Sequence, residues 1–178
     1  MGSEGEVRHG YAATSLGELL LVADGAELCG VYFPGHWHPP AAGTIGERVE
    51  VADDAVLAQA SAELDEYLRG ERTVFDVPRR GRGSAFDRRV WAALEALPFG
   101  TTTTYGAIAR ELGDAKLARR VGYAVGHNPI SIIVGCHRVL GANGKLTGYA
   151  GGLERKQLLL ELEGQALPLG MDAGVRPA

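Results

Sequence analysis

The sequence predicts an α+β protein, with a small α/β N-terminal domain built on a short antiparallel sheet and a mainly helical C-terminal domain that contains a helix-turn-helix. A hairpin signal and one helical period occupy the first 78 residues, a run rich in Arg and Gly follows, and helical periods dominate after that. We therefore expect domains at residues 1–78 and 84–169, a linker at 79–83 and a disordered tail at 170–178.

The N-terminal sheet is predicted from a hairpin. Two apolar runs, residues 19–23 and 28–33, flank Asp24-Gly25, a dipeptide that favours tight hairpin turns. The Pro- and Gly-rich segment that follows (34–46) carries no clear period and is interpreted as a link.

A helix and a strand should complete this domain. Apolar residues recur at helical spacing over residues 53–69, and Gly70 is a natural helix end. A short strand is expected at 73–77.

The C-terminal half begins with a helix whose start is well marked. Ser84 and Asp87 have the spacing of a capping box, and the apolar stripe after them ends at Pro98. Two more helices, 105–112 and 115–125, are separated by Gly113, with Thr104 as the cap of the first. Helix, turn and basic helix form the plan of a helix-turn-helix, although pairs of short helices are also common in proteins that do not bind DNA.

The last elements surround a cysteine. The apolar run 130–134, interpreted as a buried strand, leads into Gly135-Cys136-His137-Arg138, and a final helix spans 153–163 before Gly164.

Composition excludes several classes. Met1 to Gly10 lacks the apolar core of a signal peptide and no stretch has the 18 or so apolar residues of a membrane span, so we expect a cytoplasmic protein without membrane contact. Its two distant cysteines, Cys29 and Cys136, are then unlinked thiols. His36 and His38 lack further ligands nearby, so no metal is expected.

The charge is divided along the chain. Residues 1–78 hold 4 Lys and Arg against 14 Asp and Glu, whereas residues 79–145 hold 11 against 4. Clustered Lys and Arg supply the sequence-independent part of nucleic-acid affinity, so the central segment is a candidate phosphate-binding face. A solvated charged surface is the alternative.

Cys136 lies between an apolar run and two basic side chains, His137 and Arg138. Cationic neighbours favour the thiolate, which is the nucleophilic form of cysteine. A buried cysteine acting as a small hydrophobe is the alternative, and consecutive side chains in an extended segment point apart. Proton transfer from Cys136 to His137 would then need a turn or a bridging water.

Glu163 is placed where a carboxylate is unfavourable, in the last turn of its helix. A histidine held by this carboxylate would compensate, and would complete the nucleophile, base and orienting-acid arrangement of activated thiols. A solvated carboxylate is the alternative.

Six segments, in order, resemble the signatures of the O6-alkylguanine-DNA alkyltransferase family: residues 85–91, 98–106, 119–122, 127–129, 136–139 and 148–153. This resemblance covers almost the whole chain. It implies a monomer that needs no cofactor, binds double-stranded DNA containing O6-alkylguanine in the minor groove and flips the damaged base into a pocket, because O6 cannot be attacked inside the stacked duplex. The alkyl group would then be transferred once, irreversibly, to the protein.

The resemblance also assigns roles. Cys136 matches the alkyl acceptor, His137 the base that removes the thiol proton through a water, and Glu163 the carboxylate that orients the histidine. Tyr105 resembles the tyrosine that assists the departing guanine, and Asn128 the asparagine that braces the active-site turn. Arg119 matches the arginine that fills the space of the flipped base. The remaining expected DNA contacts are Thr104, Lys116, Ala118 and Arg120, and the remaining expected pocket residues are Val125, Gly135, Val139, Tyr149 and Ala150.

One departure lies beside the nucleophile. The family usually has proline before the cysteine, where this chain has Gly135. Glycine restrains the loop less than proline does and should leave extra room for bulky O6 substituents. Ala150, where the family varies between Ser and Ala, is a minor difference, and zinc ligands found in the N-terminal domain of some members have no counterpart.

Two other functions remain open from the sequence. A lesion-binding protein without transferase activity would bind DNA and leave Cys136 unmodified. A cysteine hydrolase would turn over, but would need an oxyanion hole that no residue pattern identifies.

Overall fold

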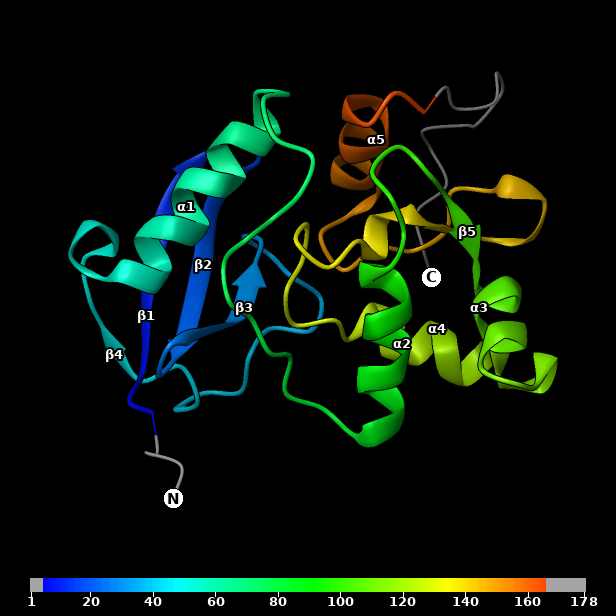
Figure 1. Cartoon of the computed structure of the whole chain (residues 1–178), viewed down its shortest axis with the longest axis horizontal. Coiled ribbons are helices and arrows are strands. Elements are labelled where there is room, and N and C mark those ends of the chain that lie inside the picture. Colours follow the sequence, from blue (N-terminus) through cyan, green and yellow to red (C-terminus); the bar gives the residue numbers. More distant parts are fainter. Residues whose placement is uncertain (1–4, 166–178) are drawn as a thin grey trace. The chain divides into compact units, whose positions relative to one another are not determined.

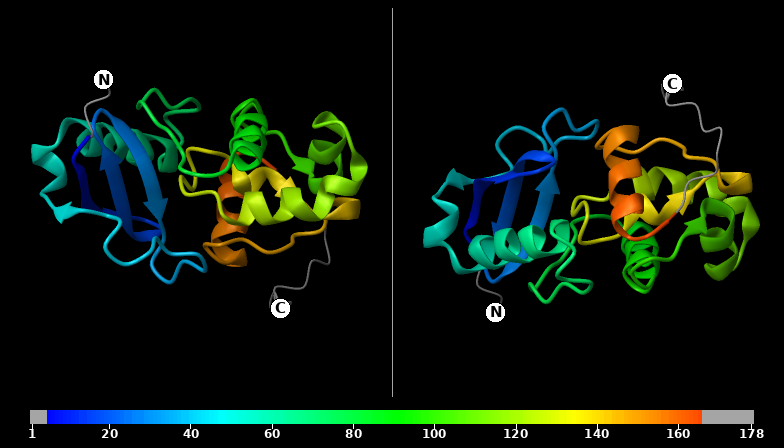
Figure 2. Two further views of the ribbon diagram at one scale, coloured as in Figure 1. Left: turned by 90° about the horizontal axis from the view of Figure 1, so that it is seen from below. Right: turned by 90° about the horizontal axis from the view of Figure 1, so that it is seen from above.

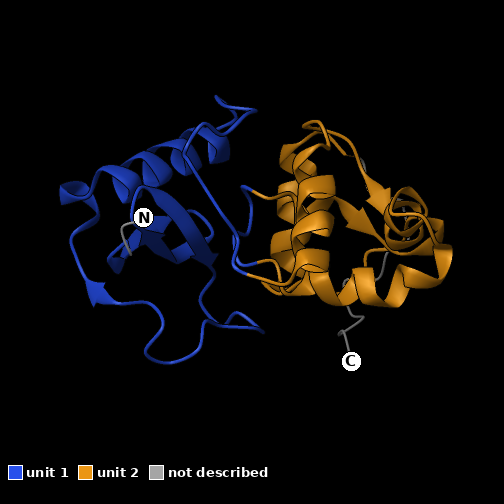
Figure 3. Cartoon of the chain, turned by 60° about the horizontal axis from the view of Figure 1, so that its bottom comes forward, with its two compact units in different colours: residues 1–82, 129–133 blue, residues 83–128, 134–178 orange. Residues whose placement is uncertain are grey.

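The computed structural model describes residues 5–165, which divide into two compact units (Figures 1 and 3). The first unit contains the described residues up to Arg82 together with residues 129–133, and the second contains residues 83–128 and those from Val134 onward. The expected tail at 170–178 lies outside the described residues. The α+β class predicted from the sequence is confirmed.

The first unit is built on a four-stranded sheet in the order β3-β2-β1-β4. Its strands are β1 (Val7–Thr14), β2 (Gly17–Asp24), β3 (Glu27–Tyr32) and β4 (Glu47–Arg48). The predicted hairpin is present: β2 and β3 are antiparallel, Asp24 pairs with Glu27, and Gly25 has φ +57°. Strand β1 was not predicted, because its polar and small residues give little apolar signal.

One helix, α1 (Ala55–Leu68), packs against this sheet (Figure 2). It follows a short 3-10 turn, η1 (Val51–Asp53). The Asp54 side chain caps it by accepting the N–H groups of Val56 and Leu57, and its inner face buries Leu57, Ala60, Leu64 and Tyr67 completely. Gly70, at φ +76°, ends it as expected.

The strand expected at 73–77 is wrong. The buried Glu63 carboxylate accepts the backbone N–H groups of Asp76 (2.9 Å) and Val77 (3.1 Å), so a side chain replaces the strand partner there. Pairing of this segment with the sheet begins slightly later in the chain, where the backbone of Pro78 and Arg80 bonds to Leu28 of β3.

The second unit is mainly helical. Its helices are α2 (Ala85–Glu95), α3 (Tyr105–Glu111), α4 (Ala118–Gly126) and α5 (Leu153–Leu162), with 3-10 turns η2 (Ala115–Leu117), η3 (Cys136–Arg138) and η4 (Ala142–Gly144). Two short parallel strands, β5 (Thr103–Thr104) and β6 (Val139–Leu140), pair beside them. The capping box of Ser84 and Asp87 is present.

Helix α4 packs against α2 and α3. Its buried residues are Val121, Ala124 and Val125, and the Trp91 indole N–H of α2 donates to the Ala124 carbonyl (2.8 Å). This packing determines which face of α4 is exposed to solvent.

The expected strand at 130–134 is also wrong. Ile130 makes a single bridge to Val31, and the chain then turns, with the Ile133 N–H bonded to the Ser131 carbonyl (2.8 Å). Ile132 has φ +70° at the centre of this turn, a strained conformation for a β-branched residue. The apolar run therefore docks on the β3 edge and reverses immediately before the cysteine loop.

Candidate active site around Cys136

The backbone before Cys136 is held at a single carbonyl. The Val134 oxygen accepts both the Cys136 N–H (2.7 Å) and the Asn128 side-chain N–H (3.0 Å). Gly135, between Val134 and Cys136, has φ −72° and ψ 54°, the geometry of an inverse γ-turn. Asn128 therefore braces the turn that presents the thiol.

The thiol is buried, at 4% exposure. Burial raises the pKa of Cys136, and this outweighs the opposite effects of the Asn128 side chain, the Lys156 charge and the Tyr149 hydroxyl. The resting group is the protonated thiol, so a nucleophilic role requires a base.

His137 is joined to Glu163 by a short hydrogen bond inside the unit. Nε2 of His137 donates to Oε2 of Glu163 (2.5 Å), and neither side chain is more than 1% exposed. Arg138 holds the same carboxylate, with Nε donating to Oε1 (2.6 Å). The contact predicted between the histidine and the carboxylate is present, and an arginine joins it.

The protonation states follow from these contacts. Burial alone would raise the pKa of Glu163, but the hydrogen bonds from His137 and Arg138 and the positive charge of Arg138 lower it to about 2. Burial lowers the pKa of His137 despite its hydrogen bond to Glu163. At neutral pH the imidazole is uncharged, with its proton on Nε2, so Nδ1 carries the lone pair of a general base.

A fully buried lysine lies on the same side of α5 as Glu163. Lys156 is fully buried, and its Nζ donates to the carbonyls of Val139 (2.6 Å) and Thr147 (3.0 Å). Burial lowers the pKa of Lys156 to about 8, so it remains largely charged at pH 7. It joins the two ends of the loop that contains η4, and its positive charge acts to lower the pKa of the Cys136 thiol.

Tyr105 begins α3 and faces the same region. Its hydroxyl is within 3.3 Å of Oγ1 of Thr147, and burial raises its pKa, so the group remains a phenol that can donate a hydrogen bond. The expected pocket residues outside the turn are all buried: Val125, Val139, Tyr149 and Ala150.

The expected DNA contacts divide into two groups. Lys116 and Arg119 are exposed, and Ala118 begins α4. Arg120 is also exposed but stacks its guanidinium on the Phe86 ring of α2, 3.9 Å from the ring centroid, and the half-buried Thr104 caps α3 by accepting the Ala107 N–H. These last two side chains therefore also hold the helices in place.

Gly135 does not open space for a ligand. A Cβ placed there would lie 3.0 Å from Cδ and Nη1 of Arg138. Arg138 occupies the volume that the sequence-based interpretation assigned to bulky substituents, and the φ of −72° is one that proline adopts.

Two residues of this site were not singled out from the sequence, Thr147 and Lys156, and Arg138 was noted only as a cationic neighbour of Cys136. A signal for Lys156 existed, because it shares the helical face of Leu159, Leu160 and Glu163 at the spacing of a buried stripe. Thr147 lies in a loop that has no period.

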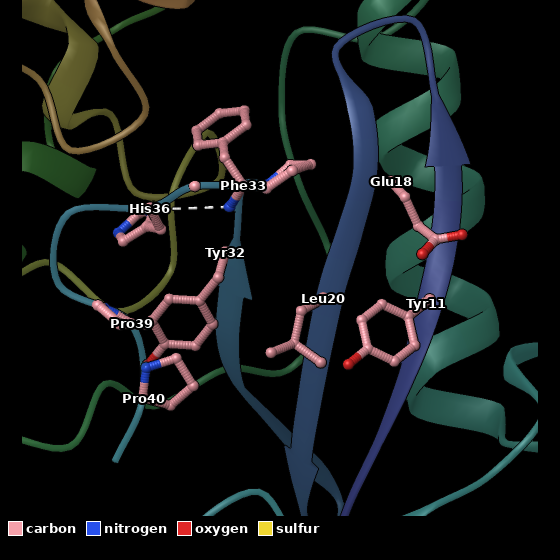
Figure 4. Close-up of a pocket in the computed structure, with 10 residues that line it drawn as sticks. Tyr11, Glu18, Leu20, Tyr32, Phe33, His36, Pro39 and Pro40 are labelled. Carbon is pink, nitrogen blue, oxygen red and sulfur yellow. Dashed lines mark hydrogen bonds between the residues drawn. The ribbon is translucent and has the colours of Figure 1, made fainter. Parts of the chain in front are cut away.

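A separate apolar pocket lies in the first unit. It has a volume of about 400 Å³ and is lined by aromatic and proline residues of β1 to β3 and of segment 34–40, with the buried His36 at its edge (Figure 4). None of the residues matched to alkyl transfer lines it. Across residues 5–165, no helix is long and apolar enough to cross a membrane, and no three metal-binding side chains of the His, Cys, Asp and Glu types cluster.

Comparison with known proteins gives a consistent result for both units. Residues 7–79 match the family described as 6-O-methylguanine DNA methyltransferase, ribonuclease-like domain, and residues 85–165 match the DNA binding domain of the same family.

Individual relatives agree. A methylated-DNA–protein-cysteine methyltransferase of Mycobacterium tuberculosis is 44% identical over 161 residues, which cover 86% of this chain and 90% of that protein. One of Mycolicibacterium paratuberculosis is 54% identical over 115 residues, covering 65% and 70%. A crystal structure of Mycobacterium tuberculosis OGT in complex with DNA has a TM-score of 0.80 and 42% identity, covering 88% of this chain and 93% of that one.

Replacing the shared carboxylate should destabilise the protein in a pH-dependent way. The pKa of Glu163 is about 2 when folded and 4.5 in a model peptide, so Glu163→Gln should cost on the order of 3 kcal/mol of unfolding free energy at pH 7. Because the folded-state pKa is depressed, this contribution is complete above pH 4.5 and is lost as the pH falls toward 2. Urea unfolding of both proteins across this range measures it.

The matched control is Glu161→Gln, an exposed carboxylate of the same helix bonded to Gln157. Its effect should be within about 0.5 kcal/mol. A Glu163→Gln difference that stays constant between pH 7 and pH 3 would contradict the assigned ionisation state.

Proposed function

This chain belongs to the 6-O-methylguanine DNA methyltransferase family, and we propose that it repairs DNA by moving an alkyl group from O6 of guanine to Sγ of its own Cys136, once per molecule. The observation that carries the proposal is the buried Cys136 on a braced turn, next to a neutral histidine held by an ionised carboxylate.

The reaction begins with the thiol proton. His137 accepts it through a bridging water, Glu163 stabilises the imidazolium that forms, and Lys156 stabilises the thiolate. The resting thiol carries its proton and the imidazole is neutral, so proton transfer from Cys136 to His137 needs no prior change of either group before substrate arrives.

The thiolate then attacks the alkyl carbon of O6-alkylguanine. A C–S bond forms as the C–O6 bond breaks, and the electron pair leaves with guanine. The Tyr105 hydroxyl donates a hydrogen bond to the leaving base and stabilises its developing charge. The thiol proton finally passes to guanine, so the step balances, and the stable thioether left on Cys136 explains why there is no second turnover.

Access to O6 requires that the nucleotide leave the stack, and helix α4 together with the preceding turn η2 has the residues for this task. Arg119 is exposed on α4 and enters the space of the extrahelical base, while Lys116 contacts the phosphate backbone. A working thiol also requires a reducing compartment, and we place the protein in the cytoplasm.

The decisive experiment is intact-protein mass spectrometry after mixing with duplex DNA containing O6-methylguanine. The mass should rise once by a methyl group replacing hydrogen, with the modification mapped to Cys136. Cys136→Ala should abolish the shift and retain DNA binding, and Cys29→Ala is the matched thiol control that should react normally.

Each of the other possible results indicates a different function or a different acceptor. Repeated turnover without a mass shift indicates a hydrolase, binding without modification indicates a lesion-binding protein, and modification at Cys29 would overturn the assignment of the acceptor.

Arg119 should matter only for duplex substrate. Extruding a base costs a few kcal/mol, so Arg119→Ala should slow repair of duplex O6-methylguanine by about 10- to 100-fold and leave the reaction with free O6-benzylguanine base unchanged within about twofold. Single-turnover rates on both substrates test this. Equal losses would contradict a role in base extrusion.

Gly135→Pro should change the rates with O6-methylguanine and O6-benzylguanine by the same factor. A ring at this position meets Arg138 rather than the substrate, and φ −72° suits proline. Gly135→Ala, which adds the same Cβ without fixing φ, is the control. A selective loss of the benzyl reaction would show that Gly135 does provide room in the substrate pocket.

A further inference from the structure

The outer face of α4 carries an exposed aromatic side chain that the proposed reaction does not use. Tyr123 is 64% exposed, although a large apolar ring favours burial. It stands one turn after Arg119, and residues four apart share a helix face. Tyr123 and Arg119 therefore point to the same side of α4, opposite the buried Val121, Ala124 and Val125.

Tyr123 is held in place by its neighbour. Its ring stacks on that of His127, with centroids 3.9 Å apart and planes inclined by 22°. Nδ1 of His127 in turn donates to the Tyr123 carbonyl (2.8 Å), which orients the imidazole. The Tyr123 ring is thus ordered before any ligand arrives. A ligand that packs on this ring therefore costs less side-chain entropy than one that must first immobilise a mobile tyrosine.

The same face of α4 lets a ligand approach closely. Gly122 and Gly126 flank Tyr123; a Cβ at Gly126 would meet no atom within 4 Å, and one at Gly122 would lie 3.7 Å from the Tyr105 ring. The helix backbone is therefore open beside the stack, and the surface continues to the tyrosine of the alkyl-acceptor site.

We propose that the Tyr123–His127 stack is a second contact to duplex DNA, in which the Tyr123 ring packs against the deoxyribose edges of the groove that α4 enters, next to the nucleotide extruded with the help of Arg119. This rests on the proposed function and adds an uncharged contact to it. The ring supplies apolar area to the sugars, His127 supports the ring, and the two glycines let the backbone come near.

The occupant follows from charge and continuity. Residues 79–145 hold 11 Lys and Arg against 4 Asp and Glu, so a polyanion is favoured here. The stack lies on the helix that carries Arg119, and a protein partner would have to compete with DNA for that same face.

The test compares variants of the stack with wild type for duplex affinity and for the rate with free O6-benzylguanine base. Tyr123→Ala should weaken binding of both undamaged and O6-methylguanine duplex by about five- to tenfold, the loss expected for one aromatic contact. Tyr123→Phe should stay within about twofold of wild type, since the ring is kept. The rate with free base should not change in either variant.

Salt dependence separates this contact from a phosphate contact. Removing a cation that binds phosphate lowers the slope of log affinity against log salt by about one, as expected for Lys116→Ala, whereas Tyr123→Ala should leave the slope unchanged. His127→Ala should weaken binding in the same direction as Tyr123→Ala, and the double variant should lose less than the sum of both.

Leu158→Ala is the control for loss of an exposed apolar side chain, since Leu158 is 52% exposed on α5, and it should bind DNA as wild type does. Unchanged affinity of Tyr123→Ala, an equal loss in Tyr123→Phe, or a matching loss with free base would each overturn the proposal. Because Cys136 alkylation is read separately, a failure here is distinguishable from failure of the transferase assignment.

Discussion

The carboxylate of Glu163 is the constraint on which the site depends. It is buried at the end of α5, where the helix dipole disfavours a negative charge, and it stays ionised because His137 and Arg138 both bind it. Arg138 also donates to the Leu97 carbonyl (2.9 Å) just after α2. One anion thus joins the ends of two helices to η3, and the residue it orients follows Cys136 directly.

The thiol itself is positioned by backbone turns rather than by regular structure. Residues 129–131 are bonded to the edge of β3, and the chain then reverses at the strained Ile132 and turns again at Gly135. A conformation of this kind costs on the order of 1–3 kcal/mol and persists only where its surroundings enforce it. The β3 bonds before Ile132, and the hydrogen bond from the Asn128 amide to the Val134 carbonyl between the two turns, supply that enforcement.

This explains what the sequence could and could not predict. Helix α1, the hairpin and the capping box at Ser84 were predictable because each depends on residues close in the chain. The segments 73–77 and 130–134 were interpreted as strands because their apolar runs are ambiguous. Their structure was decided by distant groups, the Glu63 carboxylate in one case and the β3 edge in the other.

The same division applies to the site. The pairing of His137 with Glu163 was predictable, because an unfavourably placed carboxylate calls for a partner and the resemblance named one. The role of Arg138 was not predictable. Only the folded chain shows that Arg138 binds the same carboxylate and fills the space beside Gly135. Lys156 was missed because its buried cation is satisfied by two loop carbonyls that no local pattern indicates.

The raised pKa of Cys136 suits a protein that the proposed reaction consumes. A permanently ionised, exposed thiol would react with any electrophile or oxidant and be lost. Here burial keeps the thiol protonated, and in the proposed reaction a neutral His137 removes the proton while a cationic Lys156 stabilises the thiolate. Under this proposal the thiol is a weak nucleophile at rest, and the alkyl acceptor is protected until a guanine substrate occupies the site.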